Sequence, residues 1–356
     1  MTFFTNPSFN GHESIHQFHD PSSGLKAIVA IHSTALGPAA GGCRRWVYAS
    51  EEDAITDALR LSRGMSFKNA MAGLPLGGGK GVIMAGPDLA DDNELFTSFG
   101  RFVDSLGGRY VTAEDVGVSV DNMHAVKQVT NYVAGLPGSK DSAGGDPSPW
   151  TANGVFLGLR AAVQHRLGAE SVKGLTIAVQ GVGKVGYDLC KHLHEAGATL
   201  ITSDVNQQNA DRTKNDFGAT VVAPDQILLQ HADVLAPCAL GAILTDESIK
   251  KINAKVIAGA ANNQLADKHN GLQLRERNIL YVPDYVINAG GIISVSLEYM
   301  GNKTAADTKA QIALIPPRLS DLFKSADRQS KPTNEVADAM AESIIARGNS
   351  NHSTMH

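Results

Sequence analysis

Apolar and polar residues alternate along the first part of the chain in a pattern that predicts a strand followed by a long helix. The run KAIVAIHST (26–34) is almost wholly apolar and has the length of a buried strand. Ser50, with Asp53 three residues later, forms a capping-box pattern that marks a helix N-terminus. Apolar residues then recur at helical spacing to about Met71, where we expect this helix to end.

Two further strands and a helix are expected next. GVIMA (81–85) and RYVTA (109–113) have the short apolar pattern of strands, and residues 93–106 form a helical pattern that a glycine pair ends. RYVTA leads directly into Glu114 and Asp115. Because open α/β sheets bind ligands at the carboxyl ends of their strands, these two acids are candidates for a site.

A second alternation of strands and helices follows Thr151, which we expect to cap a helix that ends near His165. The apolar runs LTIAVQ, TLITSD, DVLAP and KVIAGA alternate with helical patterns, one of them over residues 206–217. This order is typical of a doubly wound parallel sheet. The glycine- and proline-rich stretch 134–150 predicts a connecting loop, and the chain's 356 residues are enough for two α/β domains with a cleft between them.

Composition narrows the ligands to small molecules. A net charge of -5 with interspersed signs gives no basic surface for nucleic acid or a membrane. The three cysteines are scattered without metal-ligand spacing, which favours a reducing cytoplasm and no metal, and the chain shows no export signal or membrane-length apolar run. His12, His16 and His19 at helical spacing, like His192 and His194, are interpreted as structural or solvated.

The motif GVGKVG (181–186) predicts a dinucleotide site because it follows the strand TIAVQ and opens a helix. Gly181 permits the tight turn, Gly183 lets the backbone approach a pyrophosphate, and Gly186 lets helix and strand pack closely. The helix N-terminus supplies free N–H groups. The cofactor-binding residues expected here are Gly181, Val182, Gly183, Lys184, Val185 and Gly186.

Asp204 ends the next strand, where a carboxylate can accept hydrogen bonds from the adenosine ribose. The residues 205–208 that follow hold no cation for a 2′-phosphate, so NAD is favoured over NADP. The alternative is a structural glycine turn with Asp204 capping the next helix. We give it less weight, because the motif and the acid occur together at the required spacing.

Two lysines are candidates for catalysis. Lys68 lies near the end of the first helix, and Lys80 follows the run Gly77-Gly78-Gly79. A phosphate-binding loop is excluded because Leu74 and Gly81 stand where that motif needs Gly and Ser or Thr. Two ammonium groups in one partly desolvated pocket would lower each other's pKa, which suits a base. The alternative, two surface lysines and a helix-capping Asp115, remains open on the residues alone.

Eight segments resemble the leucine, valine and phenylalanine dehydrogenases of the glutamate dehydrogenase superfamily. They are GPAAGGCRRW, DALRLSRGMSFKNAMAGLPLGGGKGV, GGRYVTAEDVG, GDPSPWTANGV, GVGKVG, APCALGA, AGAANNQL and PDYVINAGG, and they span most of residues 36–297. The resemblance implies reversible oxidative deamination of an apolar L-amino acid to its 2-oxo acid and ammonia, with NAD as cofactor, by a homo-oligomer.

The resemblance also implies roles for single residues. Lys68 would bind the substrate carboxylate, Lys80 would activate water, and Asp115 would shuttle the amino proton. Asn262 would hold substrate or the nicotinamide amide. The remaining residues implied near substrate or cofactor are Gly41, Gly42, Thr151, Cys238, Ala239 and Asn288.

The domains implied by the resemblance divide the chain unevenly. Residues 1–135 with about 331–356 would form the substrate-binding and oligomerisation domain, and residues 136–330 the Rossmann domain. Pro316-Pro317 interrupts a region that the family builds as one helix.

The substrate pocket is expected to be apolar. Where glutamate-specific relatives carry Lys and Ser, this chain has Ala40 and Val295, and Ala113 and Ile292 extend the wall. A buried glutamate side chain would lack a partner, so glutamate should be rejected. Leucine, valine and isoleucine differ by too little to be ranked, and phenylalanine is the alternative because Ala40 resembles some phenylalanine enzymes.

Two other classes of function are weighed. A non-catalytic NAD-binding regulatory protein would keep the Rossmann domain but has no need of Lys68, Lys80 and Asp115. A 2-hydroxy-acid dehydrogenase needs a His with an acid partner and an Arg for the carboxylate. An assay with leucine and NAD separates the first from an enzyme, and ammonia dependence of the reverse reaction separates the second.

Overall fold

The computed structural model describes residues 3–86, 93–136, 143, 145–301 and 303–353, without side chains for 349–353. The chain divides into two compact units. Unit 1 comprises Met1–Gly145, Val295–Ala305 and Ala341–His356, and unit 2 comprises Asp146–Ser294 and Ala306–Met340. The division therefore lies ten residues beyond the boundary expected at 135/136, and the C-terminal return to unit 1 begins at Ala341. Part of the expected connecting loop, 137–142 and 144, lies outside the described residues.

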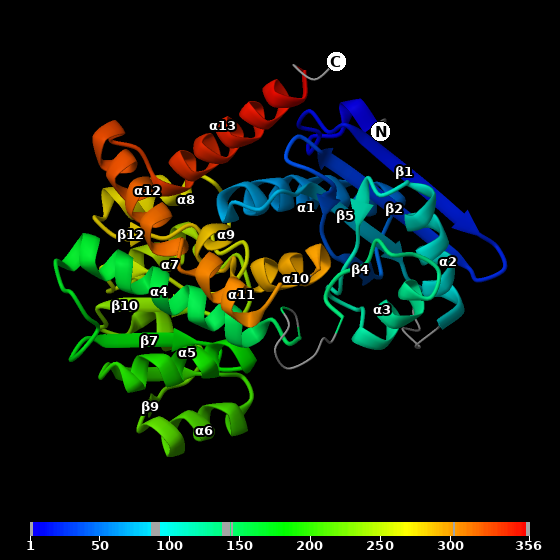
Figure 1. The fold of residues 1–356 in the computed structure, drawn as a ribbon. Helices are drawn as coiled ribbons and strands as arrows, with labels where there is room; N and C mark the ends of the chain where they lie inside the picture. The colour runs from blue at the N-terminus through cyan, green and yellow to red at the C-terminus, as the bar shows by residue number, and fades with distance from the viewer. Residues whose placement is uncertain (1–2, 87–92, 137–142, 144, 302, 354–356) are drawn as a thin grey trace. The chain divides into compact units, whose positions relative to one another are not determined.

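Unit 1 is built on a mixed sheet with the strand order β1-β2-β5-β3-β6, in which β4 also pairs with β5. β1 and β2 are antiparallel, as are β2 and β5, whereas β3 and β4 run parallel to β5. The strands are β1 (Ser14–Asp20), β2 (Leu25–Ser33), β3 (Ala39–Ala40), β4 (Cys43–Trp46), β5 (Gly77–Met84) and β6 (Tyr110–Val111). The helices are the 3-10 turn η1 (Phe3–Thr5), α1 (Glu51–Ala72), α2 (Asn93–Ser105) and α3 (Val120–Lys127) (Figure 1).

The long helix α1 begins where its sequence predicts. The Ser50 side chain accepts a hydrogen bond from the Asp53 backbone N–H at 3.1 Å, and Gly73 closes the helix in the left-handed conformation. The strand expected at 109–113 is shorter, because only two of its residues pair with β3. β3 and β4 were not predicted, since strands of two and four residues are too short for a periodic pattern.

The three glycines before Lys80 belong to β5, which therefore begins earlier than the expected residue 81. They are required for packing. A Cβ on Gly78 would lie 2.1 Å from the Ser66 backbone nitrogen of α1, and one on Gly79 would lie 2.7 Å from the Tyr110 ring. The glycines thus let α1 and Tyr110 pack directly against β5, the strand that carries Lys80.

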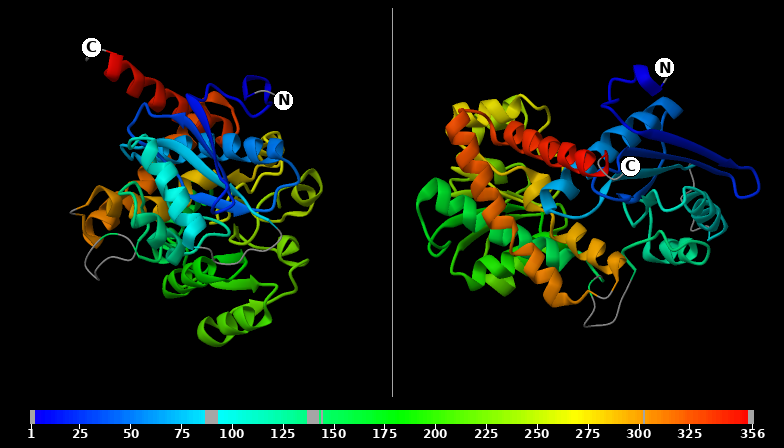
Figure 2. Two further views of the ribbon diagram at one scale, coloured as in Figure 1. Left: turned by 90° about the vertical axis from the view of Figure 1, so that its right-hand side faces the viewer. Right: turned by 45° about the horizontal axis from the view of Figure 1, so that its top comes forward.

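The histidines near the N-terminus do not share a helix face. His16 and His19 lie in β1, which forms a long hairpin with β2 at one edge of the sheet (Figure 2). Three residues apart in a strand, they point to opposite faces of the sheet. His12 is buried, and its Nε2 lies 2.9 Å from the Leu59 carbonyl oxygen.

Unit 2 is built on a parallel sheet with the order β12-β11-β10-β7-β8-β9. Its strands are β7 (Thr176–Gln180), β8 (Thr199–Ser203), β9 (Thr220–Val221), β10 (Val234–Pro237), β11 (Val256–Ile257) and β12 (Leu280–Tyr281). Its helices include α4 (Ser148–Leu167), α5 (Lys184–Glu195), α6 (Gln207–Phe217), the 3-10 turn η2 (Ile227–Leu229), α7 (Asp246–Lys251), α8 (Asn270–Glu276) and α9 (Asp284–Ile287). The C-terminal helices are α10 (Gly290–Met300), α11 (Ala305–Ile312), α12 (Ile315–Gln329) and α13 (Thr333–Ser353), and α10, α11 and α13 cross the division into units.

This strand order confirms the doubly wound sheet. β7 has β8 on one side and β10 on the other, so the order of strands reverses there and opens a crevice at their carboxyl ends. The expected helix cap at Thr151 is wrong, because α4 begins at Ser148 and Pro149 fits its first turn. Pro316-Pro317 likewise lies in the first turn of α12. Of the helices described, none has the length and apolarity needed to span a bilayer.

Candidate functional site

The candidate site in unit 1 centres on an ion pair between Lys80 and Asp115. Lys80 projects from β5, and Asp115 follows β6. The Lys80 Nζ lies 2.5 Å from Asp115 Oδ2, and the exposed fractions of the two side chains are 6% and 25%. Two residues that are 35 positions apart are therefore joined in a largely buried, charge-assisted hydrogen bond.

The charges around Asp115 keep it ionised. Burial acts to raise the pKa of this carboxyl, but the Lys80 ammonium, its hydrogen bond and the Arg44 guanidinium outweigh burial and hold the pKa below its usual value. Arg44 Nε lies 3.4 Å from Asp115 Oδ2. A carboxylate held between two cations at the end of a strand stays ionised at neutral pH and can accept a hydrogen bond from a bound ammonium group.

The glycine pair after β3 brings the backbone close to this carboxylate. A Cβ on Gly42 would lie 2.9 Å from the Asp115 Cβ, and one on Gly41 would lie 1.9 Å from the Gly79 carbonyl oxygen. Ala40 is 6% exposed and pairs with Gly78 in the sheet. The Ala113 carbonyl accepts a hydrogen bond from the Cys43 N–H at 2.8 Å, so Ala113 lies directly beside the start of β4.

Lys68 lies on α1, two residues after the Ser66 backbone that contacts β5, and is half-buried. The Asn69 side chain next to it donates to the Gly77 carbonyl at 2.6 Å, which fixes the last turns of α1 on the strand. Helix and strand thus hold Lys68 and Lys80 on adjoining elements of one rigid unit.

In unit 2 the glycine motif forms the turn between β7 and α5. Gly181 has φ +83°, which favours glycine, and a Cβ on Gly186 would lie 2.0 Å from the Gly181 carbonyl oxygen. A Cβ on Gly183 would meet nothing within 4 Å among the described residues, so the backbone there faces open space. Two glycines therefore serve packing, and Gly183 leaves room for a ligand.

Asp204 lies beside this turn. Its Oδ2 accepts from the Val182 N–H at 2.8 Å, and its Oδ1 accepts from the Asn206 N–H at the same distance. The carboxylate therefore ties the end of β8 to the glycine turn, at the crevice where the strand order reverses. Asn206 then caps α6 by accepting from the Gln208 N–H at 3.0 Å.

A cavity of about 430 Å³ opens over the turn, with walls from α4, α5 and α6. Its lining includes Arg212, a cation that lies on α6 outside residues 205–208. The Arg212 guanidinium stacks 3.6 Å from the Tyr187 ring and lies 3.6 Å from Asp216, so its charge is already engaged. Lys184, also in the lining, lies 3.3 Å from Asp146.

A second polar group of unit 2 joins residues from three segments. The Asn288 Nδ2 donates to Asn262 Oδ1 at 2.7 Å, and a Cβ on Gly291 would lie 2.7 Å from Thr151 Oγ1. Asn288 is 3% exposed, and no partner among the described residues lies within hydrogen-bonding reach of its Oδ1. The buried Oε1 of Gln180, just before the glycine turn, is unpaired in the same sense. Buried polar atoms of this kind are usually paired with protein, ordered water or a ligand.

The remaining expected residues border these groups. A Cβ on Gly181 would lie 2.6 Å from the Ala239 Cβ, and one on Gly186 would lie 3.3 Å from the Cys238 Cβ. Burial raises the pKa of the Cys238 thiol to about 12, so it stays protonated and is not a nucleophile at neutral pH. Ile292 and Val295, both half-buried, are three residues apart in α10 and share a helix face.

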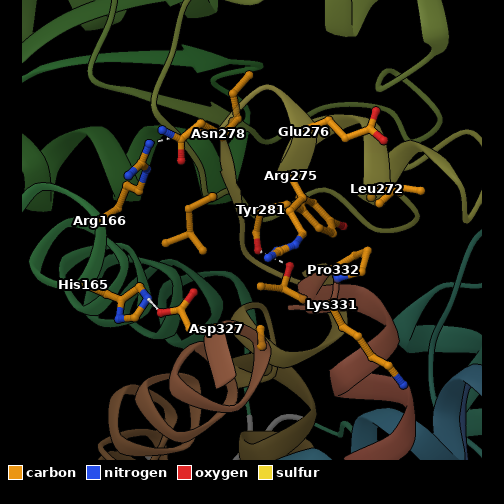
Figure 3. Close-up of a pocket in the computed structure, with 15 residues that line it drawn as sticks. His165, Arg166, Leu272, Arg275, Glu276, Asn278, Tyr281, Asp327, Lys331 and Pro332 are labelled. Atoms are coloured by element: carbon orange, nitrogen blue, oxygen red, sulfur yellow. Dashed lines mark hydrogen bonds and ion pairs between the residues drawn. The ribbon is translucent and has the colours of Figure 1, made fainter. Parts of the chain in front are cut away.

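The cavity in Figure 3 belongs to another part of unit 2. It measures about 510 Å³ and is lined by the C-terminal turns of α4 and α12, by α8 and by β12. This cavity therefore lies at the edge of the sheet where the parallel strands begin, opposite to the edge that carries the glycine turn. Two of its basic side chains are engaged, because Arg166 donates to the Asn278 carbonyl at 2.6 Å and His165 lies 3.1 Å from Asp327. We assign it no ligand.

Sequence reasoning missed Arg44 and its second carboxylate, Asp57. Arg44 lies in β4, whose four residues leave no detectable pattern. Asp57 was detectable, because Asp53, Asp57 and Arg60 follow at helical spacing on α1, but nothing local shows that it binds Arg44.

Comparison with known proteins gives one consistent family. The model "Glu/Leu/Phe/Val dehydrogenase, dimerisation domain" matches residues 12–132, and "Glutamate/Leucine/Phenylalanine/Valine dehydrogenase" matches residues 202–329. A leucine dehydrogenase of Thermoactinomyces intermedius is 50% identical over 335 residues, 94% of this chain and 91% of the relative. A phenylalanine dehydrogenase of Bacillus thermotolerans is 45% identical, over 96% of this chain and 90% of the relative. The crystal structure of L-tryptophan dehydrogenase from Nostoc punctiforme matches with a TM-score of 0.85 at 43% identity, over 95% of this chain and 97% of that one.

Proposed function

Because the chain belongs to the Glu/Leu/Phe/Val dehydrogenase family, we propose that it catalyses the reversible, NAD-dependent oxidative deamination of a branched-chain L-amino acid. Amino acid, NAD⁺ and water give 2-oxo acid, ammonium, NADH and a proton. The observation that carries the proposal is the buried Lys80–Asp115 pair at 2.5 Å. Leucine as substrate is supported by leucine dehydrogenases at about half identity over nine-tenths of the chain.

Unit 2 is proposed to hold NAD. The open face at Gly183, the Asp204 carboxylate beside the turn and the unpaired oxygen of Asn288 fit a pyrophosphate, a ribose and a carboxamide in that order along the crevice. When bound, the nicotinamide supplies the hydride acceptor. Lys184 and Val185 open the helix that faces the pyrophosphate, Thr151 and Asn262 lie by Asn288, and Cys238 and Ala239 contribute backbone beside the turn.

Unit 1 is proposed to supply the acid–base groups. Lys68 binds the substrate α-carboxylate, and Asp115 accepts a proton from the α-ammonium group, because only the free amine can drive loss of hydride from Cα. Lys80, as the neutral amine, then takes a proton from the water that adds to the imino carbon and returns it to the nitrogen. The nitrogen leaves with the proton of the new hydroxyl group as ammonium, and the proton taken by Asp115 is released to solvent. The 2.5 Å bond lets a proton pass between Lys80 and Asp115 without solvent.

The substrate pocket is proposed to be apolar, with Ala40, Ala113, Ile292 and Val295 in its walls. These side chains offer no partner for a distal carboxylate, which is expensive to bury alone. A branched aliphatic chain instead gains about 0.8 kcal/mol for each buried CH₂. The small Ala40 also leaves phenylalanine as the second candidate substrate.

Assembly and location follow from two other observations. The matched N-terminal model describes a dimerisation domain, which supports a homo-oligomer built through unit 1. All three cysteines are free thiols, which supports work in a reducing compartment, the cytoplasm.

The proposal is tested by replacing Lys80 with Ala. We expect leucine-dependent NADH formation to fall by at least about a thousandfold, on the scale seen when general acid–base groups are lost. NAD binding, measured by calorimetry, should stay within about threefold because its proposed residues lie in unit 2. Near-normal turnover by the variant would refute the role of Lys80.

A further inference from the structure

Arg44 lies between two carboxylates from different parts of unit 1. Its Nε is 3.4 Å from Asp115 Oδ2, and its Nη1 is 3.0 Å from Asp57 Oδ2 on α1. The Arg44 side chain is 23% exposed, and its guanidinium therefore links α1, β4 and the segment after β6 through charge-assisted hydrogen bonds. A planar guanidinium presents donors in fixed directions, so this geometry sets where Asp115 can lie.

Asp57 anchors the guanidinium. It is 14% exposed and accepts from the Tyr48 hydroxyl at 2.8 Å and from Arg60 Nη2 at 3.1 Å, as well as from Arg44. Arg60, by contrast, is 65% exposed and contacts the other oxygen of Asp57. Asp57 thus holds Arg44 in place from the side away from Asp115.

Several other groups bear on the charge of Asp115. Lys80 of β5 and Arg44 of β4 both lie within 4 Å of the Asp115 carboxylate. Cys43 of β4 and Tyr110 of β6 are buried, and burial raises the pKa of both, so they are neutral at pH 7. At that pH the state of Asp115 is therefore set by Lys80 and Arg44 against the opposing effect of burial.

We propose that Arg44 is a positioning residue that keeps Asp115 ionised and oriented while Lys80 is deprotonated. The inference rests on the proposed function, in which Lys80 serves as a base and passes through the neutral amine. In that state Asp115 loses its nearest cation while it is still largely buried. Arg44 retains its charge throughout, because a guanidinium does not deprotonate in proteins.

The test compares pH profiles of kcat/KM for leucine in the wild type and in Arg44→Met. Loss of the guanidinium removes a positive charge from beside the Lys80–Asp115 pair, which favours the protonated forms of both groups, so the acid limb of the profile should move to higher pH by about one unit. Arg44→Lys restores a positive charge without the second donor and should recover part of the shift. Asp57→Asn, which frees Arg44 without removing its charge, should give a smaller shift in the same direction.

Arg60→Gln is the matched control, because Arg60 shares Asp57 but does not contact Asp115. Its acid limb should coincide with that of the wild type. An unshifted limb in folded Arg44→Met, or an equal shift in Arg60→Gln, would overturn the role of Arg44. Absence of leucine-dependent turnover in the wild type would instead refute the proposed function.

A second readout does not depend on turnover. Unfolding is followed between pH 7 and pH 2, with and without Asp115→Asn, in the wild-type and Arg44→Met backgrounds. The stability that Asp115 contributes should be lost at higher pH in the Arg44→Met background, because its folded-state pKa is then less depressed. The same pH dependence in both backgrounds would overturn the inference, whatever substrate the enzyme uses.

Discussion

Replacing Gly183 and Gly186 separately with Ala should distinguish a glycine that serves a ligand from one that serves the fold. Gly183 has φ -64° and open space at its Cβ, so the added methyl group meets no protein atom. Its effect on the free energy of unfolding should stay within about 1 kcal/mol. At Gly186 the methyl group would lie 2.0 Å from the Gly181 carbonyl oxygen, and the backbone must move.

The magnitudes follow from those contacts. Overpacking against backbone costs about 1 to 3 kcal/mol, or roughly 2 to 4 °C of melting temperature for each kcal/mol in a domain of this size. In Gly183→Ala, a methyl group over the turn would deny the pyrophosphate one charge-assisted hydrogen bond, which costs about 1.5 to 3 kcal/mol. The Kd for NAD should therefore rise by about tenfold to a hundredfold.

Calorimetric titration with NAD and thermal unfolding of the unliganded protein measure the two effects independently. Gly183→Ala should lose affinity at an unchanged melting temperature, and Gly186→Ala should lose melting temperature. Unchanged NAD affinity in a folded Gly183→Ala protein would refute the placement of the pyrophosphate over this turn.

Two predictions concern the stability of unit 1. Burial lowers the pKa of His32 to about 4, with smaller contributions from His12 and Arg63, so the unfolded chain takes up this proton first as pH falls from about 6.5. The free energy of unfolding, measured in urea, should therefore fall by about 3 kcal/mol by pH 4 in the wild type and by less in His32→Gln. An equal loss in both proteins would contradict the assignment. Gly78→Ala, whose methyl group would meet Ser66, should lower the melting temperature. Gly64→Ala, on the exposed side of α1, should raise the free energy of unfolding by about 1 kcal/mol. Equal effects of the two substitutions would contradict the packing argument.

The elements that were predictable from sequence are those with long periodic patterns or local capping chemistry. α1, with Ser50 at its N-terminus and Gly73 at its C-terminus, needs no distant contact to be recognised. The doubly wound order of unit 2 was predictable because each strand there is followed by its own helix or turn. β3 and β4 were not, since such short strands are defined by their partners in β5.

The site was predictable to the extent that motifs are local. Gly181 to Gly186 and Asp204 follow from spacing, whereas pairing Lys80 with Asp115 needed the family resemblance. The Arg44–Asp57 contact depends on how β4 meets α1, which no local pattern encodes. β1 was not predicted for the same reason, because it is held as a strand by its pairing with β2 and its histidines also fit a helical period.

The most direct test of the central claim is kcat/KM of the purified protein for L-leucine and for L-glutamate, measured as NADH formation with NAD. The proposed apolar pocket predicts a preference for leucine of at least about a hundredfold, since an unpaired buried carboxylate costs several kcal/mol. Equal or greater efficiency with glutamate, or no leucine-dependent NADH, would contradict the account.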